Sequence, residues 1–599
     1  MSGRQRHNIF VAGVIAAALV IGGCPSTDST QADVTDSGTD AAVSTEASDD
    51  ASDAGVETGL DASAAASVDA AAASTENQES HFDADDLDYD ESAVVGIALD
   101  GSTATADSDA VTIDGSTVTI GAAGTYSLTG TLTDGQVVVD VADTDDVILI
   151  LDGVDITNAD GAAIAVLEAD SAVVVLADGT TNRVADGADY VFPDADTDEP
   201  NATLYSAGDM TIAGEGELVV EADYNDGITS KDGLAIESGT ISVVAADDGI
   251  RGKDYVVVDG GTITIEAGGD GIKADNDEDT ERGYIMVTDG VTDIVAGDDG
   301  VQAATDVIVT GGQLTIDAGS GSDSGRAIQG DVMVTVSGGV IDATAVNDAI
   351  HSNNEVTIDG GTITLASGDD GIHGDLFVTV NGGSITITDA FEGIESEIIT
   401  INDGLIDITS NDDGLNVASA DAASTETAPA APGRGGGPGD EAVGDHYIYI
   451  NGGSITITIA LDLAEQGDGI DANGHVVMTA GVVSVSGPTD TRNSAVDYSG
   501  GTFVMTGGLF IGTNVDGRNS EGIGTGSSQA SMYITTGSTV PGGTVVRIET
   551  TDGESLVTFE PVNDYSVIVF SSPELVDGES YDVYFDGELA GTVTAGLAG

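Results

Sequence analysis

A short acidic turn recurs along the sequence, and its side chains are of the kind that bind calcium. The tripeptide Asp-Gly-Ile, or a close variant of it, begins at Asp226, Asp248 and Asp270 and returns most often after 22 residues. Calcium takes about six to eight oxygen ligands from carboxylates and carbonyls, and such turns offer both. We therefore expect Ca²⁺ as a cofactor. The predicted metal ligands are Asp226, Asp247, Asp248, Asp270, Asp298, Asp299, Asp348, Asp369 and Asp370.

The same turns also have an interpretation that needs no metal. Asp can cap its own turn, and Gly tolerates a positive φ there. If successive turns stack about 4.8 Å apart, however, two neighbouring carboxylates repel by about 1 kcal/mol in water and by more in a shielded groove. Turn chemistry explains the residue types, whereas a stack of like charges favours a counter-ion. Both interpretations stay open from the sequence alone.

The residue after the isoleucine of each turn forms a second periodic series, which we expect to project outward beside the carboxylates. The only lysines of the chain also lie near consecutive acidic turns. One interpretation is ordinary surface salt bridges, each worth under about 1 kcal/mol. In it the two histidines, expected to stack one above the other, are simple surface residues and not a zinc site, since the sequence has no zinc-type spacing. The other is a cationic, calcium-lined patch for a carboxylated polysaccharide. The predicted carbohydrate contacts are Lys231, Arg251, Lys253, Lys273, His351 and His373.

The repeated unit also predicts the elements that carry these residues. Each unit contains short β runs and a turn that leads into alternating residues, as where Gly260-Gly261 precedes Ile263 and Ile265. A unit of about 22 residues cannot close a core alone, but stacked units can. The predicted fold class is all-β: a right-handed parallel β-helix of about 22 residues per rung, with a small C-terminal β cap or module. Its core should contain columns of isoleucines such as Ile250 and Ile272.

Composition divides the chain into four regions. Residues 1–24 are typical of a lipoprotein signal peptide in which Cys24, the only cysteine, is lipidated. Residues 25–92 are predicted to be a disordered acidic Ala/Ser/Thr tether. Residues 93–541 are predicted to form the β-helix, with a flexible insertion at about 418–445. Residues 542–599 are predicted to form the C-terminal cap. We expect export to the cell surface or the outer face of a membrane, with membrane contact only through the lipid anchor.

The charge balance excludes some partners. The chain has 106 Asp and Glu against 13 Lys and Arg, a net charge of −93. Such a field argues against nucleic acid and anionic membrane surfaces. Adaptation to salt would account for part of it. The single cysteine excludes an intrachain disulfide.

Several segments resemble a known family of secreted carbohydrate-binding domain-containing proteins. They include YSLTGTLTDGQVVVD (126–140), DDGIRGKDYVVVDGGTITI (247–265) and VNDYSVIVFSSPELVDGESYDVYFDG (562–587). The resemblance spans about residues 95–590. It implies a calcium-binding right-handed parallel β-helix similar to pectate lyases, and binding of cellulose-like and pectin-like sugars without demonstrated catalysis. The turn pattern departs from aspartate at Arg326 and Glu392 and fades after Ala495.

Three functions follow as hypotheses. The leading one is a non-catalytic cell-surface lipoprotein that binds cellulose or polygalacturonate-like polysaccharides with calcium. The second is a calcium-dependent pectate-type lyase with Lys253 or Lys273 as the base. The third is a surface adhesin or structural β-helix, which the shortage of aromatic residues for sugar stacking favours.

Overall fold

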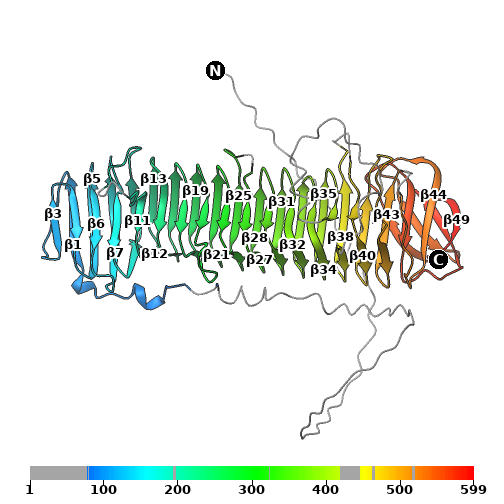
Figure 1. Ribbon diagram of the computed structural model, residues 1–599, viewed down its shortest axis with the longest axis horizontal. Helices are drawn as coiled ribbons and strands as arrows, with labels where there is room; N and C mark the ends of the chain where they lie inside the picture. The colour runs from blue at the N-terminus through cyan, green and yellow to red at the C-terminus, as the bar shows by residue number, and fades with distance from the viewer. Residues whose placement is uncertain are drawn as a thin grey trace, which may run out of the picture. The chain divides into compact units, whose positions relative to one another are not determined.

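The computed structural model describes residues 77, 80–192, 197–322, 324–418, 446–461, 466–498, 500–515 and 520–598. Cys24, the signal peptide, most of the predicted tether and nearly all of the predicted insertion lie outside the described residues. In the described part the chain is all-β, with two short 3₁₀ helices, η1 (Ala84–Leu87) and η2 (Glu91–Ala93), and no α-helix. From β5 to β43 successive rungs follow one another in chain order, and β3 lies beyond β1 at the N-terminal end (Figure 1).

Most strands belong to three parallel sheets, each made of the equivalent strand from successive rungs. Sheet 1 follows the acidic turns. It contains β4 (Thr117–Ile120), β6 (Gln136–Asp140), β8 (Ile164–Glu168), β11 (Ala202–Ser206), β14 (Asp226–Ser230), β17 (Ile250–Gly252), β20 (Ile272–Ala274), β23 (Val301–Ala303), β26 (Ile328–Gly330), β29 (Ile350–Ser352), β32 (Ile372–Val380), β34 (Ile394–Ile401), β36 (Leu415–Val417) and β39 (Ile470–Ala472).

Sheet 2 continues each rung and shares the long strands β32 and β34 with sheet 1. Its other strands are β1 (Val95–Gly101), β5 (Gly124–Leu132), β7 (Val147–Thr157), β9 (Ser171–Leu176), β12 (Asp209–Gly214), β15 (Gly233–Ile236), β18 (Tyr255–Val258), β21 (Tyr284–Val287), β24 (Asp306–Val309), β27 (Met333–Val336), β30 (Glu355–Ile358), β37 (Tyr447–Ile450), β40 (His475–Met478) and β42 (Thr502–Met505).

Sheet 3 leads back to the next acidic turn and begins on the end of β7. It contains β10 (Thr181–Ala185), β13 (Glu217–Ala222), β16 (Thr240–Ala245), β19 (Thr262–Ala267), β22 (Val291–Ala296), β25 (Gln313–Asp317), β28 (Val340–Thr344), β31 (Thr362–Ala366), β33 (Ser384–Asp389), β35 (Leu405–Ser410), β38 (Ser454–Ile459), β41 (Val482–Ser486) and β43 (Leu509–Asn514). The predicted all-β parallel β-helix with one rung per repeat is confirmed.

Columns of aliphatic side chains fill the space between the sheets. In sheet 1, Ile228 pairs in register with Ile250, and Ile250 with Ile272; all three are fully buried. Burying one such side chain is worth about 1.5–3 kcal/mol. The alternation in sheet 3 places Ile263 and Ile265 inward, as expected, and their neighbours outward. The core is thus a stack of equivalent positions rather than a closed globule.

The glycine of the acidic turn is required for space and not for a positive φ. Gly249 and Gly271 are absent from the glycines with positive φ, so the conformational explanation from the sequence is wrong for them. A Cβ on Gly271 would lie 2.3 Å from Ile294 Cγ2 and 2.5 Å from the carbonyl oxygen of Gly300. The positive φ belongs to the second glycine of the Gly-Gly turns, as at Gly261 with φ +90°.

Both ends of the β-helix are closed by antiparallel strands, which limits the exposure of sheet edges. At the N-terminal end β2 (Ala104–Ala106) pairs with β1, and β3 (Val111–Asp114) with β4. At the other end β47 (Tyr565–Ser571) pairs with both β43 and β44 (Ser531–Val540). A separate four-stranded antiparallel sheet follows, and it consists of β45 (Val546–Thr550), β46 (Ser555–Phe559), β48 (Ser580–Phe585) and β49 (Glu588–Thr594). The antiparallel cap therefore starts at β44, before the predicted boundary at residue 542.

The structure differs from the predicted tether at its C-terminal end. Residues 80–92 are described and pack on sheet 2. His81 Nδ1 lies 2.7 Å from the Tyr255 hydroxyl, and its Nε2 lies 2.8 Å from Thr211 Oγ1. Asn77 Nδ2 donates to Asp306 Oδ2 at 2.7 Å. Polar contacts with residues far away in the sequence fix the position of this stretch, although its amino-acid composition predicted a disordered tether.

Candidate functional site: a ladder of turn carboxylates

The first residue of each acidic turn occupies an equivalent place just before a sheet 1 strand. We call this set the turn ladder. Backbone bonds fix the stacking, since Gly227 N–H donates to the Asp248 carbonyl at 2.9 Å and Gly249 N–H to that of Asp270 at 2.8 Å. The turn ladder consists of Asp226, Asp248, Asp270, Asp299, Arg326, Asp348, Asp370, Glu392, Asp413, Asp468 and Ser494.

Most carboxylates of the turn ladder cap the following rung. Asp248 Oδ1 accepts from the backbone N–H of Asp270 at 3.0 Å, and Asp270 Oδ1 from that of Asp299 at 2.9 Å. The same bond joins Asp348 to Asp370 at 3.1 Å, and also joins Asp413 to Asp468. A buried amide left without such an acceptor costs about 1–3 kcal/mol. The aspartate thus caps the next turn instead of its own, and this role alone can explain its recurrence.

Basic side chains contact most carboxylates of the ladder between Asp226 and Asp370; Asp299 has no ion pair among the described residues, and burial raises its pKa to about 7. Lys273 Nζ lies 2.5 Å from Asp270 Oδ2 and 3.5 Å from Asp248 Oδ2. Arg251 contacts Asp226 at 3.4 Å and also pairs with Asp275. The pKa of Lys273 is raised, because its burial, which lowers it, is outweighed by Asp248 and Asp270.

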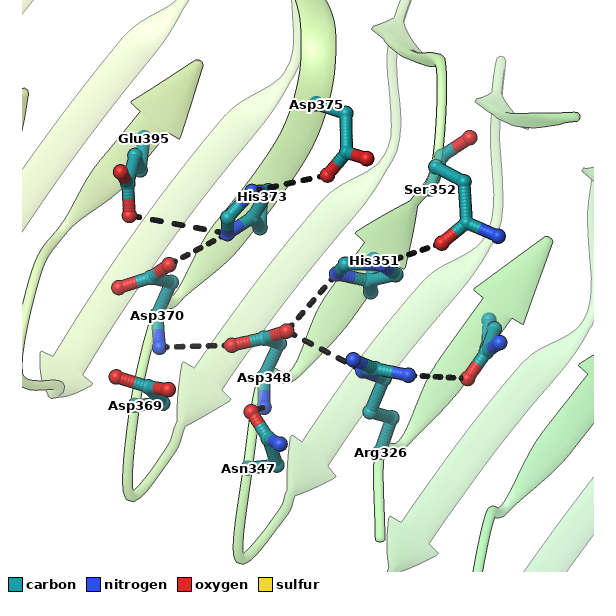
Figure 2. A network of polar contacts seen from close by, with 12 residues as sticks. Arg326, Asn347, Asp348, His351, Ser352, Asp369, Asp370, His373, Asp375 and Glu395 are labelled. Atoms are coloured by element: carbon teal, nitrogen blue, oxygen red, sulfur yellow. Dashed lines mark hydrogen bonds and ion pairs between the residues drawn. The ribbon is translucent and has the colours of Figure 1, made fainter. Parts of the chain in front are cut away.

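Two histidines contact the ladder carboxylates of the next rungs (Figure 2). His351 Nδ1 lies 2.9 Å from Asp348 Oδ2, to which Arg326 Nε also extends at 3.3 Å. His373 Nδ1 lies 2.7 Å from Asp370 Oδ2. Burial raises the pKa of Asp348, but the interactions with His351, His373 and Arg326 together outweigh burial, and the pKa is lowered. The prediction of surface histidines is wrong, since both side chains are almost fully buried, at 7% and 11% exposure.

Beyond His373 no described Lys, Arg or His side chain forms an ion pair with a carboxylate of the turn ladder. Among the described residues, Glu392, Asp413 and Asp468 have no ion pair. Burial and then the neighbouring carboxylates raise the pKa of all three well above the ordinary range. Oxygens of Asp413, Asp468 and Asp471 lie within 4.8 Å of one another. Here the charges that the sequence predicted to need a counter-ion have none from the described chain.

An amide side chain lies on the neighbouring strand β36. Asn416 Nδ2 donates to Glu392 Oε2 at 2.8 Å in the preceding rung. Asn416 Oδ1 is buried and has no hydrogen-bond partner. Asn416 pairs in register with Asp471. Three carboxylates and one amide oxygen are the donor set that calcium prefers.

The predicted site residues separate into groups in the structure. Asp226, Asp248, Asp270, Asp299, Asp348 and Asp370 are brought together in the ladder. Asp247, Asp298 and Asp369 lie one residue before it and are more exposed. Of the predicted carbohydrate contacts, Arg251, Lys273, His351 and His373 are engaged with ladder carboxylates. Lys231 instead pairs with Glu199 at 2.6 Å, and Lys253 is exposed.

The prediction of metal ligands missed Asp413, Asp468, Asp471 and Asn416. A signal for them was present in the sequence. The position after each turn's aliphatic residue holds Arg251 or Lys273 in early rungs but Asn416 and Asp471 in late ones. The loss of basic residues at that position marks where the ladder has no internal counter-charge.

In the part of the chain that the structure describes, no helix has the length and apolar character needed to cross a membrane. Residues 114–371 match a family model described as "Carbohydrate-binding domain-containing protein". A curated protein of the same description from Acetivibrio thermocellus is 35% identical over 150 residues, which are 25% of this chain and 52% of that protein. The chain thus spans about half the length of that relative.

A solved structure of a polysaccharide lyase-like protein from C. thermocellum, a gadolinium derivative, is also similar. It is 37% identical, and the match covers 39% of this chain and 93% of that one with a TM-score of 0.38.

Proposed function

We propose that this chain, whose residues 114–371 match the family model of carbohydrate-binding domain-containing proteins, binds polysaccharides with the help of calcium. The family supports carbohydrate binding in general. Our finer proposal is a non-catalytic protein that binds acidic, polygalacturonate-like or cellulosic chains. The observation that carries it is the cluster of Asp413, Asp468 and Asp471, whose carboxylate oxygens lie within 4.8 Å of one another.

Calcium fits this part of the ladder better than the part predicted from the sequence. From Asp226 to Asp370 the counter-charges are already Arg251, Lys273 and other basic side chains. Asp413 and Asp468 have carboxylate oxygens close together, and Asn416, which pairs in register with Asp471, has a buried Oδ1 without a hydrogen-bond partner. Bound there, calcium would neutralise the carboxylates and leave positions for an anionic ligand. A uronate carboxylate is such a ligand, and a chain of net charge −93 would otherwise repel it.

Two tyrosines support binding of neutral glycans. Tyr447 and Tyr449 lie on the outward face of β37, with ring centroids 5.3 Å apart and planes 4° apart. His475 lies 4.9 Å from the Tyr447 ring on the next rung. Half-exposed aromatic rings of this kind offer an apolar face and a polar tip to a sugar. This is the surface on which a cellulose-like chain would pack.

The test is binding of polygalacturonate and of cellulose by the full-length protein in about 1 mM calcium and in excess chelator. We expect chelation to weaken polygalacturonate binding strongly, and Asp468→Asn to do the same in calcium. Asp490→Asn, which changes a carboxylate paired with Arg492 outside the ladder, is the matched control. Undiminished polygalacturonate binding in chelator would refute the role of calcium.

The lyase hypothesis gains no support from Lys273. A catalytic base must be unprotonated near the working pH, whereas Asp248 and Asp270 hold Lys273 in its protonated form. Lys253 is exposed, so this argument does not apply to it as the catalytic base. Formation of unsaturated uronides from polygalacturonate in calcium would show lyase activity and replace the non-catalytic proposal.

We retain the cell-surface lipoprotein as a proposal from the sequence around Cys24. It predicts that Cys24→Ser moves the protein out of the membrane fraction; an unchanged distribution would contradict lipid anchoring.

A further inference from the structure

The two ladder histidines form a donor set unlike the rest of the ladder. His351 and His373 are in register on β29 and β32, and their ring centroids are 5.0 Å apart. Oxygen or nitrogen atoms of Asp348, His351 and His373 lie within 4.8 Å of one another, as do those of Asp370, His373 and Glu395. All five side chains are buried. Imidazole with carboxylate favours zinc and related transition metals, whereas calcium prefers oxygen alone.

The outer nitrogen of each ring already has an acceptor. His373 Nε2 lies 3.3 Å from Asp375 Oδ1, and His351 Nε2 lies 3.1 Å from Asn353 Oδ1. Histidines that bind metals usually donate their other ring N–H to such an oxygen, which fixes the tautomer and the ring orientation. With Nε2 as the donor, Nδ1 of each ring presents its lone pair toward the ladder carboxylates. Figure 2 shows both rings held between these inner and outer partners.

Nδ1 of each ring, the nitrogen that faces the ladder carboxylates, then needs a second proton or a metal ion beside it. His351 Nδ1 faces Asp348 Oδ2 at 2.9 Å, and His373 Nδ1 faces Asp370 Oδ2 at 2.7 Å and Glu395 Oε2 at 3.8 Å. A neutral ring with its proton on Nε2 would set a lone pair against a carboxylate oxygen, which is repulsive. Either a second proton on each ring or one divalent ion between the rings removes that repulsion.

We propose that His351 and His373, together with Asp348, form a binding site for one transition-metal ion of the zinc class, with Asp370 and Glu395 as neighbouring carboxylates. Two imidazoles and a carboxylate are a ligand set that zinc uses in proteins. Asp375 and Asn353 orient the two rings. The site is separate from the calcium position at Asp413, Asp468 and Asp471, and it does not depend on the proposed function.

The experiment is equilibrium dialysis of the full-length protein against Zn²⁺ with excess Ca²⁺ present, with bound metal measured by mass spectrometry. We expect one tightly bound zinc per chain that calcium does not displace. His351→Gln with His373→Gln should weaken zinc binding by more than about 100-fold, and Asp375→Asn by about 10–100-fold. His475→Gln, a histidine on β40 hydrogen-bonded to Thr502, is the matched control and should bind like the wild type.

Cobalt supplies a readout that reports on nitrogen ligands. Co²⁺ added to the wild type should give visible absorption bands that are lost in the double histidine variant and kept in His475→Gln. Circular dichroism melting without metal shows whether each variant is folded, and Asp375→Asn keeps the test valid if the double variant is not. Absence of stoichiometric zinc in the wild type, its displacement by calcium, or unchanged binding in the histidine variants would each overturn the proposal. In that case the rings of His351 and His373 would be doubly protonated and would neutralise the ladder carboxylates by their own charge.

Discussion

Asp306 shows how a single buried carboxyl makes stability depend on pH. It begins β24, is 1% exposed, and burial raises its pKa to about 6 despite the hydrogen bond from Asn77. Because the folded pKa is above the unfolded one, the stabilising effect of protonation is complete below about pH 4 and is lost as the pH rises through about 6. We expect Asp306→Asn to match the wild type near pH 4 and to be more stable by on the order of 2 kcal/mol at pH 7. Urea unfolding at both pH values measures this, and an equal difference at the two would contradict it.

Gly271 tests the spatial role of the turn glycine. Its position touches Ile294 of sheet 3 and the carbonyl of Gly300 in the next rung. Gly271→Ala forces these backbones and side chains apart, and such overpacking costs about 1–3 kcal/mol. Gly96→Ala is the matched control, because Gly96 has no heavy atom within 4 Å of a built Cβ and no positive φ. Thermal melting should show a lower midpoint for Gly271→Ala alone; equal effects would mean that the turn accommodates a methyl group.

The strands and turns of each rung could be predicted from the sequence because the residues that specify them lie close together in the chain. The acidic turn, the Gly-Gly turn and the alternation after it all lie within one unit, so the pairing of Ile250 with Ile272 followed from spacing. Contacts between distant residues did not. Arg326 pairs with Asp348 from the previous rung, and His81 reaches Tyr255, 174 residues away. No local pattern encodes those choices, which is why salt bridges to neighbouring aspartates could be proposed from the sequence but the particular partner of Arg326 and the order of residues 80–92 could not.

Asp270 has two roles that substitutions can separate. Its Oδ1 accepts a hydrogen bond from the next rung, and its charge pairs with Lys273. Asp270→Asn keeps an Oδ1 that accepts from the Asp299 N–H but removes the ion pair with Lys273, which retains Asp248 at 3.5 Å. Asp270→Ala removes both and leaves a buried amide unsatisfied. We therefore expect the alanine variant to lose about 1–3 kcal/mol more than the asparagine variant in denaturant unfolding. Equal losses would show that charge pairing, and not the cap, holds the turn.

The whole molecule combines a uniform backbone with an uneven distribution of counter-charge. The three parallel sheets repeat from β4 to β43, but among the residues that the structure describes the basic side chains in contact with the turn ladder extend from Arg251 to His373. In a stacked-repeat protein each rung contacts mainly its neighbours, so stability is close to a sum of local terms. The rungs around Asp413 and Asp468 should therefore be a region of low local stability unless a cation is bound.

Calcium should accordingly protect one part of the β-helix and not the whole. An ion present at about 100 times its Kd stabilises the state that binds it by about 2.7 kcal/mol, which is about 100-fold in amide exchange. We expect calcium to slow hydrogen exchange in β36 and β39, the strands that follow Asp413 and Asp468, and to leave β17 and β20 unchanged because Arg251 and Lys273 already neutralise their turns. Asp468→Asn should abolish the difference. Hydrogen exchange with mass spectrometry resolves these segments, and protection centred on Asp248 and Asp270 would instead place calcium where the sequence alone predicted it.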